Sequence, residues 1–296
     1  MDMTAELTKR TEQIENIIKK YLPEEEGYQK QVIEAMNYSF LAGGKRLRPM
    51  LMLETYRMFG GKSEVIEPFM AAIEMIHTYS LIHDDLPAMD NDEYRRGRKT
   101  THVVYGEDMA ILAGDALLNY AFETAVKAFV LEPEDSLTIG NAIRVLGEKA
   151  GIYGMLGGQV IDVKETGHAV SKDVLDTIYE LKTGALIEAA MMIGAILGGA
   201  SQEEVKTVER IASLVGLAFQ VQDDILDVIS TQEELGKPIH SDEKNEKTTY
   251  VTLLGIDDAK KVVEEKSEEA ISLLQTLPNE NPYLEELLME LIHRKK

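Results

Sequence analysis

The sequence predicts an all-α protein, and three observations support this prediction. Apolar residues recur at the three- and four-residue spacing of a helix, as in Val205, Val208, Ile211, Ala212 and Val215. Alternation with a period of two residues is hard to find, and no proline interrupts the chain between Pro133 and Pro238. Aromatic residues make up 6% of the chain and tryptophan is absent, which disfavours a β-rich core. We therefore expect a single all-α domain over residues 1–296, with its helices packed in layers.

The helices are expected between short breaks, most of them marked by proline or glycine. These breaks are predicted at residues 23–27, 60–62, 87–99, 131–135, 164–171, 198–201, 235–247 and 278–282. None of them resembles a flexible interdomain linker. Two segments between the breaks, 69–82 and 185–197, are apolar almost all round. Helices of this kind lie in the middle of a bundle.

The composition excludes several classes of function. The chain has 296 residues, with 31 Lys and Arg against 52 Asp and Glu, and its formal net charge is −21. Such a chain is a poor general partner for nucleic acid or for an anionic membrane surface. The absence of cysteine excludes disulfides, zinc–thiolate sites and thiol nucleophiles. The mean hydropathy is −0.17, and no apolar run is long enough for a membrane span, so we expect a cytoplasmic protein.

Acidic residues directly follow the first of the two apolar helices. Phe69–His83 runs into a series of carboxylates, Asp84, Asp85, Asp90, Asp92 and Glu93. Carboxylates at the C-terminal end of a helix face the negative end of its dipole, and here they also repel one another. Either solvent exposure or a bound divalent cation explains this run.

A second helix, expected over residues 205–230, carries acids in its middle. Gly216, Gln220, Asp223 and Asp227 are spaced four, three and four residues apart, so they lie on one face. An unpaired buried carboxylate is very costly. A stripe that leads from small residues to carboxylates therefore suggests the wall of a cavity with a metal at its acidic end.

The first apolar helix has a similar polar stripe, because His77, Ser80 and Asp84 share a face. Two such helices can clamp cations between them, and ligands that are all oxygen select Mg²⁺, Mn²⁺ or Ca²⁺ rather than zinc. Mg²⁺ usually completes its shell with substrate phosphates. We therefore expect a phosphorylated ligand whose apolar part lies deeper in the bundle.

Basic residues are clustered despite the negative net charge. Residues 43–49 read Gly-Gly-Lys-Arg-Leu-Arg-Pro, residues 95–99 read Arg-Arg-Gly-Arg-Lys, and a third set consists of Gly236, Lys237 and Lys247. Glycine lets backbone N–H groups approach an anion, and arginine binds phosphate oxygens in bidentate fashion. Each cluster alone is also explained by an exposed turn. Together with the acids, they suggest two anionic substrates that meet in one cavity.

In combination, these motifs resemble the trans-prenyltransferases, or isoprenyl diphosphate synthases, and most of all the bacterial farnesyl diphosphate synthases. The resemblance rests on GGKRLRP at 43–49, DDLPAMD at 84–90, RRG at 95–97, KT at 182–183, FQVQDDILD at 219–227, Lys237 and KTTY at 247–250. It covers most of the chain. It implies packed helices around a deep central cavity, usually in a homodimer. The implied reaction joins isopentenyl diphosphate to an allylic diphosphate, dimethylallyl or geranyl.

The resemblance also implies a role for each matching residue. Mg²⁺, or Mn²⁺ as a substitute, would be held on the allylic diphosphate by Asp84, Asp90 and Asp223, with Asp85, Asp224 and Asp227 in support. The same diphosphate would be bound by Arg95, Lys182, Thr183, Gln220, Lys237 and Lys247. The expected catalytic residues among these are Lys182, Thr183 and Gln220. Isopentenyl diphosphate would be bound by Lys45, Arg48, His77 and Arg96.

Chain length in this family depends on the bulk of residues about one turn before the first acidic motif. Tyr79 and Ser80 lie five and four positions before Asp84. We expect Tyr79 to form the floor of the cavity and to stop growth at farnesyl diphosphate, although ordinary helix packing would also explain this residue. The loop 237–247 carries His240 at a position where the family usually has glycine. This departure from the family concerns the closing motion of the loop.

Other functions remain open at this point. Geranylgeranyl diphosphate and longer polyprenyl diphosphates are the alternative products. A class I terpene cyclase shares the acidic motifs but does not need Lys45, Arg48 and a second diphosphate site. A non-catalytic subunit of a heteromeric synthase usually lacks one acidic motif, whereas this chain has both. A di-metal bundle would use Glu-x-x-His pairs such as Glu74 with His77 and Glu290 with His293.

Overall fold

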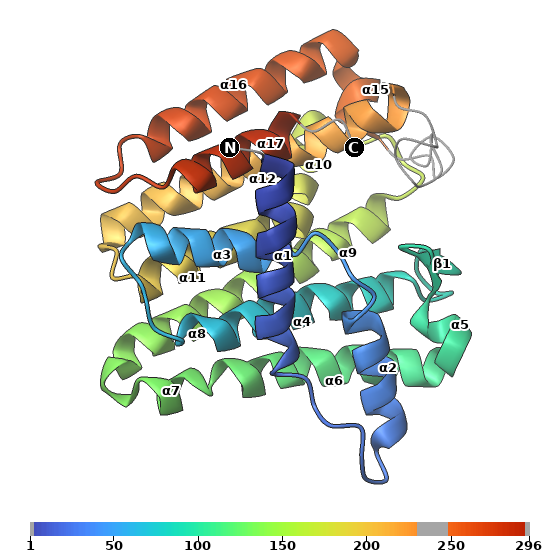
Figure 1. Cartoon of the computed structure of the whole chain (residues 1–296). Coiled ribbons are helices and arrows are strands. Elements are labelled where there is room, and N and C mark those ends of the chain that lie inside the picture. Colours follow the sequence, from blue (N-terminus) through green and yellow to red (C-terminus); the bar gives the residue numbers. More distant parts are fainter. Residues whose placement is uncertain (1–2, 230–247, 294–296) are drawn as a thin grey trace.

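Helices in layers and one short hairpin make up the computed structural model, which describes residues 3–229 and 248–293 (Figure 1). The elements before the centre of the chain are α1 (Met3–Lys19), α2 (Lys30–Phe40), α3 (Leu47–Met58), α4 (Ile66–Asp84), β1 (Tyr94–Arg95), β2 (Arg98–Lys99), α5 (Thr101–Tyr105), α6 (Glu107–Ala125), α7 (Ala128–Leu131) and the 3₁₀ turn η1 (Pro133–Asp135). After them come α8 (Ser136–Ala150), α9 (Met155–Glu165), α10 (Lys172–Ile178), the π-helical turn η2 (Tyr179–Gly184), α11 (Ala185–Leu197), α12 (Gln202–Ile229), α15 (Tyr250–Leu254), α16 (Ile256–Leu274) and α17 (Pro282–His293). The predicted all-α class is confirmed.

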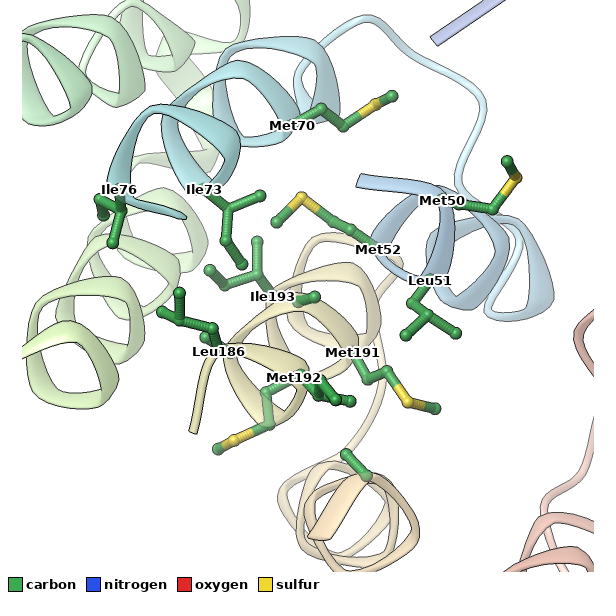
Figure 2. Close-up of a cluster of buried hydrophobic side chains, with 14 of the residues drawn as sticks. Met50, Leu51, Met52, Met70, Ile73, Ile76, Leu186, Met191, Met192 and Ile193 are labelled. Carbon is green, nitrogen blue, oxygen red and sulfur yellow. The ribbon is translucent and has the colours of Figure 1, made fainter. Parts of the chain in front are cut away.

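The centre of the molecule is built by α3, α4 and α11. Every residue of α11 from Ala185 to Ala195 is buried, and so are most residues of α4. Figure 2 shows Met52, Ile73 and Ile193 pointing toward one another between these three helices. Truncating a buried side chain of this kind to alanine costs roughly 2–5 kcal/mol. The prediction that 69–82 and 185–197 form central helices is therefore confirmed.

One glycine lets α3 and α11 approach closely. A Cβ on Gly194 would overlap the carbonyl oxygen of Met52 and would lie 3.0 Å from the backbone nitrogen of Tyr56. Only a residue without a side chain fits there, so this position sets the spacing of the two central helices.

Helix α1 crosses over α3 and α4 (Figure 1), and a buried arginine fastens it there. Arg46 has a left-handed backbone with φ of 48°, which turns its side chain inward. Its guanidinium donates to Glu15 at 2.6 Å, to Glu74 at 2.7 Å and to the carbonyl oxygen of Phe40 at 2.6 Å. A buried cation with this many acceptors is satisfied, so Arg46 holds α1 against α4.

A second buried charge joins α1, α3 and α17. Glu54, which is 2% exposed, accepts hydrogen bonds from Arg10 of α1 and from the side-chain nitrogen of Asn281, the latter at 3.1 Å. The guanidinium of Arg10 lies over the ring of Tyr283 at 3.6 Å. We call this group of four residues, Arg10, Glu54, Asn281 and Tyr283, the Glu54 clasp.

Most predicted breaks fall between the observed helices. Residues 60–62 separate α3 from α4, and residues 198–201 separate α11 from α12. The breaks before α3, with Gly43 and Gly44 at positive φ, and at 151–154 are not among those predicted. The second acidic helix begins at Gln202 rather than 205, and the predicted break at 235–247 lies outside the described residues. None of the helices in the described ranges is long and apolar enough to cross a membrane.

Candidate active site

A cavity of about 470 Å³ lies among α3, α4, α6, α9 and η2. Many of the residues singled out from the sequence line it, namely Arg48, His77, Tyr79, Ser80, Asp84, Lys182 and Thr183. Much of the remaining wall is apolar, and includes Leu86, Met89, Ile111, Met155 and Leu156. The cavity therefore combines acidic and basic groups with an apolar interior surface.

The basic part of the cavity is formed by Arg48 and His77. Arg48 lies in the first turn of α3, and its Nε atom is buried without a protein hydrogen-bond partner. A buried donor without a protein partner leaves a place for an acceptor such as an ordered water or an anion. Burial lowers the pKa of His77 well below its ordinary value, and the charges of Arg48 and Arg96 lower it further.

Two of the three basic clusters of the sequence, residues 43–49 and 95–99, meet beside this wall. Arg96 occupies the turn between β1 and β2 with φ of 53°, and its guanidinium donates to the carbonyl oxygen of Gly43. A Cβ on Gly44 would lie 2.8 Å from Arg96 Nη1, so the glycine allows this close approach. Lys45 is exposed in the same loop and does not line the cavity.

The acidic part of the cavity is the end of α4. Asp84 is the last residue of the helix, and the side chain of Gln159 donates to its Oδ1 at 2.5 Å. Burial raises the pKa of Asp84 to about 6, and the nearby carboxylates of Asp90 and Asp85 also raise it. The backbone N–H of Asp90 donates to the carbonyl oxygen of Asp84 at 2.9 Å, which holds the exposed Asp90 in the same turn.

Asp85 points to a different partner. Its Oδ1 accepts a hydrogen bond from Arg95 Nε at 2.8 Å, and Nη2 of the same guanidinium lies 2.6 Å away in an ion pair. Burial nevertheless raises the pKa of Asp85, although the hydrogen bond from Arg95 opposes this shift. Asp85 thus fixes Arg95 of the β1–β2 hairpin next to the acidic end of α4.

Lys182 and Thr183 are presented by the π-helical turn η2. Lys182 Nζ lies 2.6 Å from Asp162 Oδ2, and Thr183 Oγ1 donates to Gln220 Oε1 of α12 at 3.0 Å. Glycines on both sides allow tight packing, because a Cβ on Gly158 would overlap the Lys182 backbone nitrogen and a Cβ on Gly216 would lie 3.0 Å from Gly184 Cα. Turns with π-helical hydrogen bonding are frequent at functional sites.

The second acidic motif lies on the other side of η2. A smaller pocket of about 130 Å³ is lined by Lys182, Thr183, Gln220 and Asp224, among others. Asp224 is buried, and its Oδ2 accepts from Tyr179 Oη at 2.7 Å and from the backbone N–H of Tyr250 at 2.8 Å. Asp223 is half-buried and Asp227 is buried. Lys182 and Thr183 line both the large cavity and this smaller pocket, so they connect the two acidic helices.

Tyr79 and Ser80, the residues expected to govern chain length, lie on α4. Tyr79 is 6% exposed, and its ring meets the imidazole of His83 edge to face with the centroids 5.8 Å apart. Ser80 Oγ donates to the carbonyl oxygen of His77 at 2.9 Å. Both residues line the cavity, so bulk at either position reduces its volume.

Sequence reasoning missed several residues of this site. Gln159 and Asp162 contact Asp84 and Lys182, and His83 contacts Tyr79. Gln159 and Asp162 are three residues apart in the helix 155–165, so they lie on one face of it. This spacing is the signal in the sequence that could have identified them. Lys237, Lys247 and His240 lie outside the described residues.

Comparisons with known proteins identify the family. The family model described as "Polyprenyl synthetase" matches residues 29–288. A geranylgeranyl diphosphate synthase from Cyanophora paradoxa is 45% identical, and the match covers 89% of this chain and 87% of the relative. A farnesyl diphosphate synthase from Geobacillus stearothermophilus is 44% identical, covering 86% of this chain and 85% of the relative.

A solved structure shares the whole fold. The geranyltransferase from Helicobacter pylori, solved with magnesium and isoprenyl diphosphate, superposes with a TM-score of 0.84 at 34% identity, covering 99% of this chain and 97% of that one. The chain therefore belongs to the polyprenyl synthetase family. It is a prenyltransferase, as the resemblance of its motifs implied.

Proposed function

We propose that this chain is a Mg²⁺-dependent farnesyl diphosphate synthase, which joins isopentenyl diphosphate head to tail to dimethylallyl and then to geranyl diphosphate. One observation carries the proposal: Asp84, the pair Arg48 and His77, and the buried Tyr79 line one cavity with apolar walls. Carboxylates suit a metal-bound diphosphate, guanidinium groups suit a second diphosphate, and apolar walls suit a hydrocarbon chain.

Isopentenyl diphosphate is assigned to Lys45, Arg48, His77 and Arg96. The buried, unpartnered Nε of Arg48 supports this assignment, because a diphosphate oxygen would supply the missing acceptor. The contact between Arg96 and the Gly43 carbonyl holds the loop that carries Lys45 close to the hairpin. Lys45 is exposed in this loop.

The allylic diphosphate and its metals are assigned to Asp84, Asp90 and Asp223, with Arg95, Lys182, Thr183, Gln220, Lys237 and Lys247. Burial is the main cause of the raised pKa of Asp84, and repulsion from Asp90 and Asp85 adds to it; a bound Mg²⁺ would favour the ionised carboxylate against both effects, so the raised pKa fits a cation site. Within the described ranges, no three Asp, Glu or His side chains converge closely enough to hold a metal by themselves. Phosphate oxygens of the substrate and water would complete an all-oxygen shell, and Mn²⁺ has the same preference.

The residues divide the chemistry between them. Bound Mg²⁺ would supply positive charge for the leaving diphosphate. Lys182 and Arg95 add fixed positive charge where negative charge grows on the departing oxygens. Gln220 would help to hold the diphosphate, Thr183 would face the allylic cation, and the apolar walls would exclude the water that could trap it. The double bond of isopentenyl diphosphate then attacks the cation, a carbon–carbon bond forms, and a proton passes to the departed diphosphate.

The product length is assigned to Tyr79. Its ring is buried at the wall of the cavity, so it limits the space for the growing chain. Relatives named for farnesyl and for geranylgeranyl products are about equally similar to this chain. Direct measurement of the product is therefore the test of this assignment.

We also propose that the chain forms a homodimer. Large apolar side chains are exposed on α6, on α8 and in the region of α9, among them Ile111, Leu112, Leu137, Ile152, Tyr153 and Val160. Apolar patches rimmed by polar residues mark interaction surfaces. A second copy of the chain would cover these side chains.

The experiment incubates the protein with Mg²⁺, isopentenyl diphosphate and either dimethylallyl or geranyl diphosphate, and measures product length by mass spectrometry. We expect farnesyl diphosphate from both allylic substrates and none in the presence of EDTA. The variant Tyr79→Ala should yield longer chains, because the floor is removed. A longest product equal to that of the wild type would show that Tyr79 is not the floor.

The same assay separates the competing functions. Geranylgeranyl diphosphate as the main wild-type product would replace farnesyl in the proposal. A cyclic hydrocarbon formed without isopentenyl diphosphate would identify a terpene cyclase instead. Absence of turnover with every allylic partner would overturn the synthase proposal and favour a non-catalytic subunit.

A further inference from the structure

His83 links the Tyr79 ring to the neighbouring helix α6. It lies one turn after Tyr79 on α4, and the two rings meet edge to face at 5.8 Å with an interplanar angle of 79°. On its other side, His83 Nε2 lies 3.1 Å from the carbonyl oxygen of Ile111. A carbonyl oxygen only accepts, so Nε2 carries a proton in this contact. Both rings and Ile111 line the cavity.

Gly114 of α6 provides the space that the imidazole occupies. A Cβ on Gly114 would overlap Nε2 and Cδ2 of His83 and would lie 2.8 Å from Cε1. The imidazole therefore rests directly on the backbone of α6. The imidazole lies between the Tyr79 ring and α6 and also lines the cavity, so we expect an imidazole displaced from α6 to move toward the cavity.

We propose that His83 and Gly114 are specificity-determining residues for product length, because together they fix the Tyr79 ring at its distance from α6. The inference rests on the proposed function of Tyr79 as the floor of the cavity. His83 is a positioning residue in this arrangement, and Gly114 is the residue that permits it. The size of the cavity then depends on a contact between α4 and α6 as well as on the bulk of Tyr79.

Two substitutions test the proposal in opposite directions. His83→Ala removes the imidazole, so the floor loses its support and the fraction of products longer than the main wild-type product should rise several-fold. Gly114→Ala pushes the imidazole toward the cavity, so products should shorten, with geranyl diphosphate accumulating. The matched control is Gly140→Ala, a helical glycine whose added Cβ meets nothing within 4 Å. It should leave the product ratio unchanged.

The double variant makes the test independent of simple destabilisation. In His83→Ala/Gly114→Ala there is no imidazole to displace, so its product ratio should match that of His83→Ala. Thermal unfolding of each variant checks that it is folded. An unchanged ratio in both single variants, lengthening by Gly114→Ala, or additive effects in the double variant would overturn the proposal. The product ratio of each variant is compared with that of the wild type, whatever the main wild-type product is. A wrong assignment of the farnesyl product is therefore distinguished from a wrong role for His83.

Discussion

The carboxyl group of Asp84 binds a proton more tightly in the folded protein than an exposed aspartate does. Burial is the largest cause, and Asp90 and Asp85 add repulsion, so its pKa rises to about 6. A carboxyl with a raised pKa stabilises the fold when protonated and loses that contribution as the pH rises through 6. At neutral pH the ionised Asp84 therefore destabilises the protein without metal, as expected of a group placed for binding a cation.

Replacing this carboxylate should stabilise the metal-free protein. In EDTA at pH 7.5, Asp84→Asn should raise the free energy of unfolding by about 2 kcal/mol, and this gain should vanish as the pH falls from 6 to 4. Urea unfolding at several pH values measures it. The control Asp257→Asn changes an exposed acid in the first turn of α16 and should give no such gain. A stability of Asp84→Asn below that of the wild type at pH 7.5 would contradict the assignment.

Arg46 and Arg48 show what a sequence cannot reveal at the scale of single residues. Both lie in the GGKRLRP motif, and both are arginines of a predicted phosphate-binding cluster. The left-handed backbone at residue 46 turns Arg46 into a buried ion pair with Glu15 and Glu74, while Arg48 lines the cavity. This distinction depends on a tertiary contact with α1, which local patterns do not encode.

At the scale of elements, the turn η2 connects the two halves of the site. Its sequence is compatible with an ordinary helix, so the π-helical geometry could not be predicted from it. The helices on either side were predictable because apolar periodicity and short breaks define them. The close approach of α9 and α12 to η2 depends instead on Gly158 and Gly216, whose packing partners are far away in the sequence.

The position of Lys182 should therefore respond to Gly158. The variant Gly158→Ala would force the added Cβ against the Lys182 backbone nitrogen and displace the turn. A displacement of reacting groups by roughly 1 Å can cost about 100-fold in rate, so we expect kcat to fall by about that factor with smaller changes in KM. Steady-state kinetics with both substrates measures this. Gly147→Ala, whose Cβ would lie 3.8 Å from Phe122, is the matched control, and an equal loss in both variants would contradict the idea.

At the scale of the whole molecule, the exposed apolar side chains on α6, α8 and α9 predict a dimer. Sedimentation velocity should give twice the chain mass of 33.0 kDa. Leu137→Lys should weaken the dimer, because Leu137 is 82% exposed on α8 and a lysine there would be buried by the partner. Leu253→Lys, an exposed position on α15, should leave the mass unchanged. A wild-type mass of one chain at every concentration would exclude this interface.

The Glu54 clasp also constrains how the protein is made. Asn281 lies 227 positions after its partner Glu54, and nearly all of the bundle is synthesised between them. During translation, the last hydrogen bonds of Glu54 and of α3, which carries it, can form only after α17 has emerged from the ribosome. Until then the nascent chain lacks a contact that unites its first and last helices, so its final, fully cooperative structure is reached only late in translation.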